Sequence, residues 1–214
     1  MIILLSVIDL QVKHGFNLQR KFYLEPDRFE TEIFDFLWEH RKPSLTWLSI
    51  IHSTYDYHSY YILHYFSQLY YMIYGQIPSF DLLLGAYLHD IGKLKNYDLF
   101  FSQKYVPPEN RYKIEQHVTD GYNFLTKNFS QHPIVADMAF YHHERSDGTG
   151  YPTHQKKLPP MIALLASIDV FVALQEPRKY RKNLINIHDE WQKEKVHLYS
   201  PYTDYVDKIL TPHT

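Results

Sequence analysis

The amino-acid sequence predicts an all-α protein built as a helical bundle, and three observations support this fold class. After Leu45, apolar residues recur mainly at spacings of three and four, which is the period of an amphipathic helix. Strand-like alternation is confined to the first two dozen residues. Hydrophobic residues make up 45% of the 214 residues and charged residues 21%, so the chain can bury a sizeable core.

The first 44 residues differ in pattern from the rest and are expected to form a small N-terminal module. Residues 1–24 alternate loosely between apolar and polar side chains, which is compatible with a short hairpin. A helix is expected between Pro26 and Pro43, where the apolar residues follow a helical spacing: Phe29, Ile33, Phe36 and Leu37. We therefore divide the chain into this module, residues 1–44, and a main domain, residues 45–214.

The main domain reads as helices joined by short loops. No internal repeat and no low-complexity tract interrupts this pattern. We expect helices at about 46–75, 79–93, 109–128, 131–143, 158–175, 181–196 and 201–210.

Charge, cysteine content and hydropathy exclude several classes of protein. The formal net charge of −2 gives no broad basic surface for nucleic acid. The absence of cysteine excludes disulfides, iron–sulfur clusters and thiolate zinc sites. The apolar run from Met1 to Leu10 is too short to span a bilayer and has no basic leader, so we expect a soluble, cytoplasmic protein with no membrane contact.

Five expected helices each place an ionisable residue on an otherwise apolar face, and the chain has 14 histidines in all. A single such residue is more often a core histidine bonded to a backbone carbonyl, but five together favour convergence on metal ions in the bundle core. Imidazoles and carboxylates without sulfur suit Fe, Mn, Zn or Ni, and six or seven ligands exceed one tetrahedral zinc. We therefore expect two bridged metal ions, held by groups on these faces: His58, His89 with Asp90, His117, His142 and Asp169.

Two motifs resemble those of a known enzyme family. Residues 88–93, LHDIGK, resemble the signature of the HD phosphohydrolase superfamily, and residues 142–152, HHERSDGTGYP, are similar to the HHExxDGxGYP element of its HD-GYP subfamily. The resemblance runs from about residue 45 to residue 210 and includes Ser200-Pro201. It implies an HD-domain helical bundle that hydrolyses cyclic di-GMP to linear pGpG, with some members continuing to GMP.

The resemblance also assigns residues to roles. Asp90 would bridge two divalent metal ions, Fe or Mn, and a hydroxide between them would attack phosphorus while Lys93 orients the phosphate. Asp90 and Lys93 are thus the expected catalytic residues. The implied metal ligands are His58, His89, Asp90, His117, His142, His143 and Asp169, and the implied substrate contacts are Gly150, Tyr151, Arg178 and Arg181.

Several positions depart from the family pattern. Thr54 stands where some members have a glutamate for a third metal, so two metals are expected. Ala163 and Val172 replace an arginine and an aspartate, and the loop from Thr153 to Lys157 is shortened, changes that we place in the surroundings of the ligands and at the substrate rim. These departures leave two alternatives open. One is an inactive module that binds a cyclic dinucleotide or a signalling-protein partner, and the other is a phosphohydrolase for another nucleotide.

Two acidic residues and two glycines of the second motif are expected to shape its loop rather than to react. We expect Glu144 and Asp147 to fix the loop by hydrogen bonds, and Gly148 and Gly150 to serve its backbone conformation. A purely structural helical bundle is the remaining alternative, and it would leave the five inward-facing polar groups without an explanation.

Overall fold

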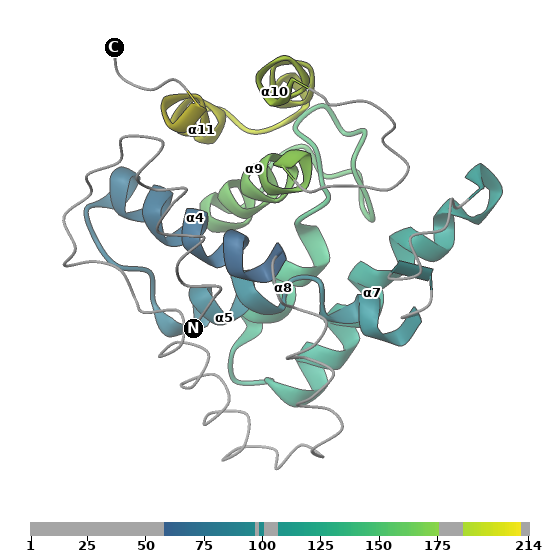
Figure 1. Cartoon of the computed structure of the whole chain (residues 1–214). Coiled ribbons are helices and arrows are strands. Elements are labelled where there is room, and N and C mark those ends of the chain that lie inside the picture. The colour runs from purple at the N-terminus through teal and green to yellow at the C-terminus, as the bar shows by residue number, and fades with distance from the viewer. Residues whose placement is uncertain (1–57, 97–98, 101–106, 176–185, 211–214) are drawn as a thin grey trace, which may run out of the picture.

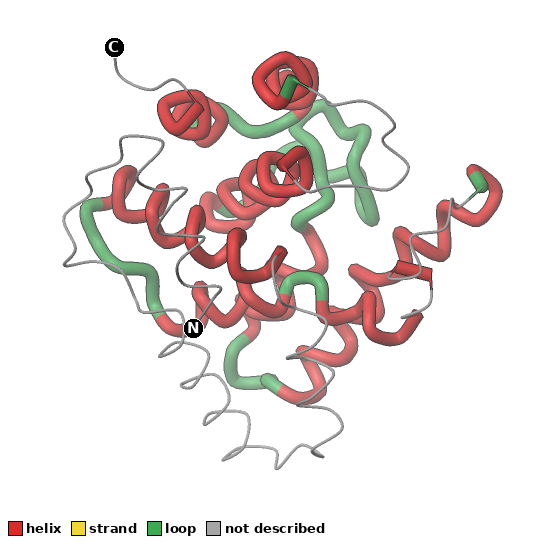
Figure 2. Tube along the Cα trace, in the orientation of Figure 1, coloured by secondary structure: helices red, strands yellow, loops and turns green. Residues whose placement is uncertain are grey.

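The computed structural model describes residues 58–96, 99–100, 107–175 and 186–210. Every regular element in these ranges is helical, and no strand occurs among them (Figure 2). The predicted all-α class is therefore confirmed for this part of the chain. The expected N-terminal module, residues 1–44, lies outside the described residues, and so do residues 46–57 of the first expected helix. The boundary between module and main domain stays a prediction.

The helices follow the order expected from the sequence, and several begin at capping residues. Pro133 and Pro160 are the first residues of their helices, where a backbone N–H would have no partner within the helix. The side chain of Asn186 accepts hydrogen bonds from the backbone N–H groups of His188 and Asp189 at the start of another. The elements are α4 (His58–Tyr74), α5 (Phe80–Leu88), the 3₁₀ helix η1 (Ile91–Asn96), η2 (Pro108–Asn110), α7 (Arg111–Asn128), α8 (Pro133–Tyr141), α9 (Pro160–Gln175), α10 (Ile187–Glu194), η3 (Lys195–His197) and α11 (Tyr202–Leu210).

Two helices are shorter than the sequence predicts, and both end just before candidate ligands. The helix expected at 79–93 stops at Leu88, and the helix expected at 131–143 stops at Tyr141. After the first break the chain turns into η1, where a Cβ on Gly92 would collide with the backbone of His117 and Gly121 in α7. This close backbone approach needs glycine and draws η1 onto α7.

The helices pack in three layers (Figure 1). Helices α5 and α8 pack against each other in the centre, with α4 and α9 on one side and η1 and α7 on the other. Helices α10 and α11 cover the outer side of α9. Every residue from Ile162 to Val172 of α9 is therefore buried, which explains why this helix is apolar on all its faces.

Two hydrophobic clusters make up most of the core. One includes Phe66, Leu165 and Trp191, and the other includes Leu84 and Leu125. Helices α5 and α8 contribute side chains to both clusters, as expected of a central layer. Among the described residues, no helix combines the length and the apolar character that a bilayer crossing needs.

Candidate metal centre

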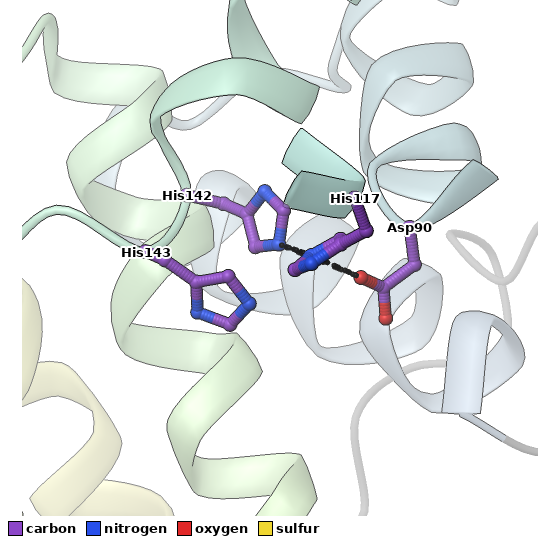
Figure 3. A group of neighbouring side chains, drawn as sticks. All are labelled: Asp90, His117, His142 and His143. Atoms are coloured by element: carbon purple, nitrogen blue, oxygen red, sulfur yellow. Dashed lines mark hydrogen bonds and ion pairs between the residues drawn. The ribbon is translucent and has the colours of Figure 1, made fainter. Parts of the chain in front are cut away.

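The seven side chains expected to bind metal lie together where α4, α5, α7, α8 and α9 meet. Figure 3 shows four of them pointing toward one another. Most are buried in the core despite their polarity. Their places in the fold are as follows: His58 opens α4, His89 and Asp90 follow α5, His117 lies within α7, His142 and His143 follow α8, and Asp169 lies within α9.

The ligand atoms form two groups that share Asp90. One group contains His58, His89 and Asp90, the other contains Asp90, His117, His142 and His143, and within each group the candidate ligand atoms lie within 4.8 Å of one another. Oδ1 of Asp90 is 3.2 Å from Nε2 of His117 and 3.5 Å from Nε2 of His142. Oδ2 is 3.4 Å from Nε2 of His89 and 3.7 Å from Nε2 of His58. The carboxylate therefore presents one oxygen to each group.

Asp169 also spans the two groups. Its Oδ1 lies 3.2 Å from Nε2 of His58 and 3.8 Å from Nε2 of His89. Its Oδ2 lies 3.7 Å from Nδ1 of His143, which belongs to the other group. Two carboxylates on different helices thus connect the same two sets of imidazoles, an arrangement suited to a pair of metal ions.

The tautomers of three histidines are fixed by backbone carbonyls. Nδ1 of each ring lies 2.6 to 2.9 Å from the carbonyl oxygen of the residue three positions earlier. A carbonyl oxygen can only accept, so Nδ1 carries the hydrogen and the Nε2 lone pair faces the carboxylates. In a metal-ligating histidine, the ring nitrogen that does not bind the metal typically donates such a hydrogen bond. The three pairs are His89 with Ala86, His117 with Ile114, and His142 with Ala139.

The polar atoms of the centre are incompletely satisfied within the described part of the chain. Nε2 of His89 and Oδ1 of Asp90 are buried there and make no hydrogen bond. Buried nitrogen and oxygen atoms without hydrogen-bond partners, gathered in one place, are suited to holding a cation. The donor set of imidazoles and carboxylates fits divalent Fe, Mn, Zn or Ni.

Burial and neighbouring charges give the ligands suitable protonation states. Burial lowers the pKa of His142 to about 4, and burial together with His142 lowers that of His143 well below its ordinary value, so both rings are neutral. Burial raises the pKa of Asp90, but Lys93 and His89 outweigh it and hold this pKa well below the ordinary value. The same holds for Asp169 with His58 and His89.

The pKa of His89 is raised, unlike the pKa values of His142 and His143. Burial lowers its pKa, but Asp90 and Asp169 outweigh burial and raise the pKa to about 9. The two carboxylates thus attract a positive charge to Nε2 of His89. A metal cation bound at Nε2 would take the place of the proton.

Lys93 and Tyr151 lie at the edge of the centre. The ammonium of Lys93 donates to Oδ2 of Asp90, and its side chain is 26% exposed. The Tyr151 ring lies 4.7 Å from the His143 ring and 6.5 Å from the His117 ring. Burial raises the pKa of the Tyr151 hydroxyl, and Asp169 and Asp90 add to the effect, so the hydroxyl stays protonated and can donate.

The loop that carries Tyr151 is held by hydrogen bonds to two carboxylates, those of Glu144 and Asp147. Glu144 is fully buried, and its Oε1 accepts from the backbone N–H and hydroxyl of Thr153 at 2.7 and 2.6 Å. Its Oε2 accepts from the backbone N–H of Gln155 at 2.9 Å. Asp147 accepts from Thr149 through Oδ1, and its Oδ2 lies 2.6 Å from Nδ1 of His197. The expectation that Glu144 and Asp147 fix this loop is confirmed.

Both glycines of this loop occupy positions that require the absence of a side chain. Gly148 has φ of 84°, in the left-handed region. A Cβ on Gly150 would collide with the backbone of His143 and Arg145. Gly150 thus lets the loop fold back on the segment next to the ligands, while its expected contact with substrate stays a prediction.

Comparison with known proteins places the chain in a family. The sequence model of the family described as HD domain matches residues 75–201, more than half of the chain. The chain belongs to the HD domain family. Its second motif, HHERSDGTGYP, together with relatives named as cyclic di-GMP phosphodiesterases, identifies it as an HD-GYP member.

Three relatives share about a third of their aligned residues with this HD-GYP chain. A "Cyclic di-GMP phosphodiesterase" of Thermotoga maritima is 33% identical over 129 residues, which cover 56% of this chain and 34% of the relative. A "3'3'-cGAMP-specific phosphodiesterase 1" of Vibrio cholerae is 37% identical over 108 residues, which cover 48% and 24%. A cyclic di-GMP phosphodiesterase of Pseudomonas aeruginosa is 33% identical over 103 residues, which cover 46% and 25%. The aligned region thus spans about a third or less of these relatives.

The departures from the HD-GYP pattern fall in different places. Ala163 and Val172 are 2% and 1% exposed and belong to hydrophobic clusters of the core. Both positions therefore pack against apolar neighbours within the core, not at an exposed rim, and they belong to the surroundings of the helix that carries Asp169. Thr54, Arg178 and Arg181 lie outside the described residues.

Sequence reasoning did not find Phe100, whose ring lies 5.6 Å from that of His117.

Proposed function

We propose that this HD-GYP chain is a metal-dependent phosphodiesterase that hydrolyses cyclic di-GMP to linear pGpG. The observation that carries the proposal is the pair of carboxylates, Asp90 and Asp169, each of which presents one oxygen to each of two histidine groups. This arrangement supports binding of two divalent metal ions at adjacent positions. Relatives named as cyclic di-GMP and cGAMP phosphodiesterases support the substrate class.

The residues of the centre divide the work of a phosphodiester hydrolase. Two divalent ions held there would supply Lewis acidity toward the phosphoryl oxygens and would lower the pKa of water to make a nucleophile. Asp90 would hold both ions, and His89, His117 and His142 would be oriented by their backbone carbonyls.

Lys93 and Tyr151 would position the substrate. The Lys93 ammonium has three hydrogens, so it can keep its bond to Asp90 and donate another to a phosphoryl oxygen. The protonated hydroxyl of Tyr151 is a second donor at the same edge. Gly150, Arg178 and Arg181 remain proposed substrate contacts on the strength of the family motif.

The test is turnover of cyclic di-GMP by protein loaded anaerobically with Fe²⁺ or Mn²⁺. The double variant His89→Ala, Asp90→Ala should lose both metal and product formation while its far-ultraviolet circular dichroism stays helical. The matched control is His188→Ala, Asp189→Ala, because it removes a sequence-adjacent His–Asp pair that is exposed on α10. Full turnover by the first variant would contradict the proposal.

A substrate panel separates this function from its neighbours. The relatives that act on 3'3'-cGAMP favour testing that hybrid dinucleotide beside cyclic di-GMP. Faster hydrolysis of the hybrid would reassign the substrate within the same class. A wild-type protein that binds metal and nucleotide but releases no product would instead identify a binding module.

A further inference from the structure

Phe100 is an aromatic residue at the centre that belongs to neither sequence motif. Its ring centroid lies 5.7 Å from Nζ of Lys93. The ring also meets the His117 ring nearly edge-on, at 5.6 Å between centroids and 72° between planes. The residue is half-buried and so keeps part of its surface accessible. An accessible aromatic ring beside a cation that orients phosphate is a combination suited to a nucleotide, because base–aromatic stacking and phosphate pairing act together.

We propose that Phe100 determines substrate specificity by stacking on one purine base of a bound cyclic dinucleotide. This inference rests on the proposed function, because it takes the surroundings of Lys93 as the place of the scissile phosphate. A base is joined to its phosphate through a single ribose. A phosphate held at Lys93 therefore brings a base within reach of a ring that already lies against the Lys93 ammonium.

Tyr151 provides a second ring at the same centre. Phe100 and Tyr151 come from segments far apart in the sequence, yet both contact the ring of His117. A cyclic dinucleotide carries two bases on one macrocycle, which is formed by two riboses and two phosphates. Two aromatic side chains beside one phosphate-binding centre therefore fit a cyclic dinucleotide better than a mononucleotide.

A different role for Phe100 must be separated from base stacking. The ring could act through Lys93 alone, because an ammonium near an aromatic face is held there electrostatically. Such a positioning role would affect every phosphodiester, with or without a base. Stacking would affect only substrates that carry bases. The two roles thus differ in their dependence on the substrate.

The experiment uses the metal-loaded chain with Phe100→Leu and Phe100→Trp. Leucine keeps an apolar side chain but has no π face, whereas tryptophan keeps one. The control is Tyr112→Leu, because the Tyr112 ring lies 5.8 Å from Nζ of Lys113 on the outside of α7 and is 60% exposed. The measurements are metal content, affinity for a phosphorothioate analogue of cyclic di-GMP, and turnover of cyclic di-GMP and of methyl p-nitrophenyl phosphate, a diester without a nucleobase.

We expect Phe100→Leu to weaken binding of the analogue and raise KM for cyclic di-GMP by roughly 5- to 150-fold, the range set by one base stacked on an aromatic side chain. Metal content and turnover of the simple diester should stay unchanged, and Phe100→Trp should restore affinity. Unchanged affinity in Phe100→Leu, an equal loss on the simple diester, or loss of metal would each overturn the proposal.

The binding measurement keeps this inference separate from the proposed function. If the wild-type chain binds the analogue but hydrolyses nothing, the proposed function fails while the affinities of the Phe100 variants still decide the stacking role. If the wild-type chain hydrolyses cyclic di-GMP and Phe100→Leu behaves identically, only the stacking role fails. If the wild-type chain binds no analogue, both fail.

Discussion

Replacing Glu144 by glutamine tests whether hydrogen bonds to its buried carboxylate hold the loop that carries Tyr151. The two carboxylate oxygens of Glu144 accept three hydrogen bonds from Thr153 and Gln155. A glutamine can keep its carbonyl oxygen on Thr153, but its NH₂ group then faces the N–H of Gln155. One charge-assisted bond is lost and a buried donor is left without an acceptor, at a cost of about 2 kcal/mol.

The effect should appear in both stability and turnover. About 2 kcal/mol lowers the thermal midpoint of a chain of this size by roughly 4–8 °C, which calorimetry can measure. Because the same loop carries Tyr151 beside His143, we expect kcat/KM for cyclic di-GMP to fall by about 10- to 100-fold. Metal content should not change, because Glu144 is not among the candidate ligands.

The matched control is Glu190→Gln, a partly exposed glutamate paired with Lys193 on α10, which should change neither quantity. An unchanged thermal midpoint in Glu144→Gln would refute the hydrogen-bond argument. A normal midpoint and metal content combined with a turnover loss greater than about a thousandfold would assign the carboxylate a chemical role instead.

Three further perturbations test the metal centre and the packing around it. Chelation should lower the thermal midpoint, and added Mn²⁺ should restore it. Free metal at 100 times its Kd adds about 2.7 kcal/mol to the free energy of unfolding, and an unchanged thermal midpoint after chelation would argue against metal binding. Gly92→Ala should lower the free energy of unfolding in urea by about 1–3 kcal/mol, because a Cβ collides with the His117 backbone. Burial raises the pKa of Asp207, but Lys195 and Trp191 outweigh it and lower this pKa below its ordinary value. The ionised form therefore stabilises the fold above about pH 4, and the gap in thermal midpoint between wild type and Asp207→Asn should close as the pH falls further; a gap independent of pH would contradict this.

The sequence predicted the helical bundle and six of the seven converging side chains for a physical reason. Apolar spacing marks the buried face of a helix, and an ionisable residue on that face must meet a partner in the core. His58 and His117 could be located in this way because they lie on periodic helices. The two motifs then identified His143, which helical periodicity alone would not have assigned to the inner face.

Other features depend on tertiary contacts that spacing does not encode. The apolar period runs through His89 and His142, so the helices were expected to continue, yet both stop just before these residues. The first break accompanies the approach of Gly92 to α7, a contact between segments 25 residues or more apart. Phe100 resembles any core phenylalanine in the sequence, and only its contacts with Lys93 and His117 distinguish it.

The place of the centre in the fold would make bound metal ions structural as well as chemical. His58 and Asp169 come from α4 and α9, on one side of the central pair α5 and α8, whereas His117 comes from α7 on the other side. Neither side holds a complete ligand set, and Asp90 contributes an oxygen to both groups. Ions bound here would connect all three layers and would bind only when the layers are assembled, so their binding energy would add to folding stability. The loss of metal should therefore loosen the packing of α4 and α9 against α7 as well as abolish turnover, and increased hydrogen exchange should extend through all three layers.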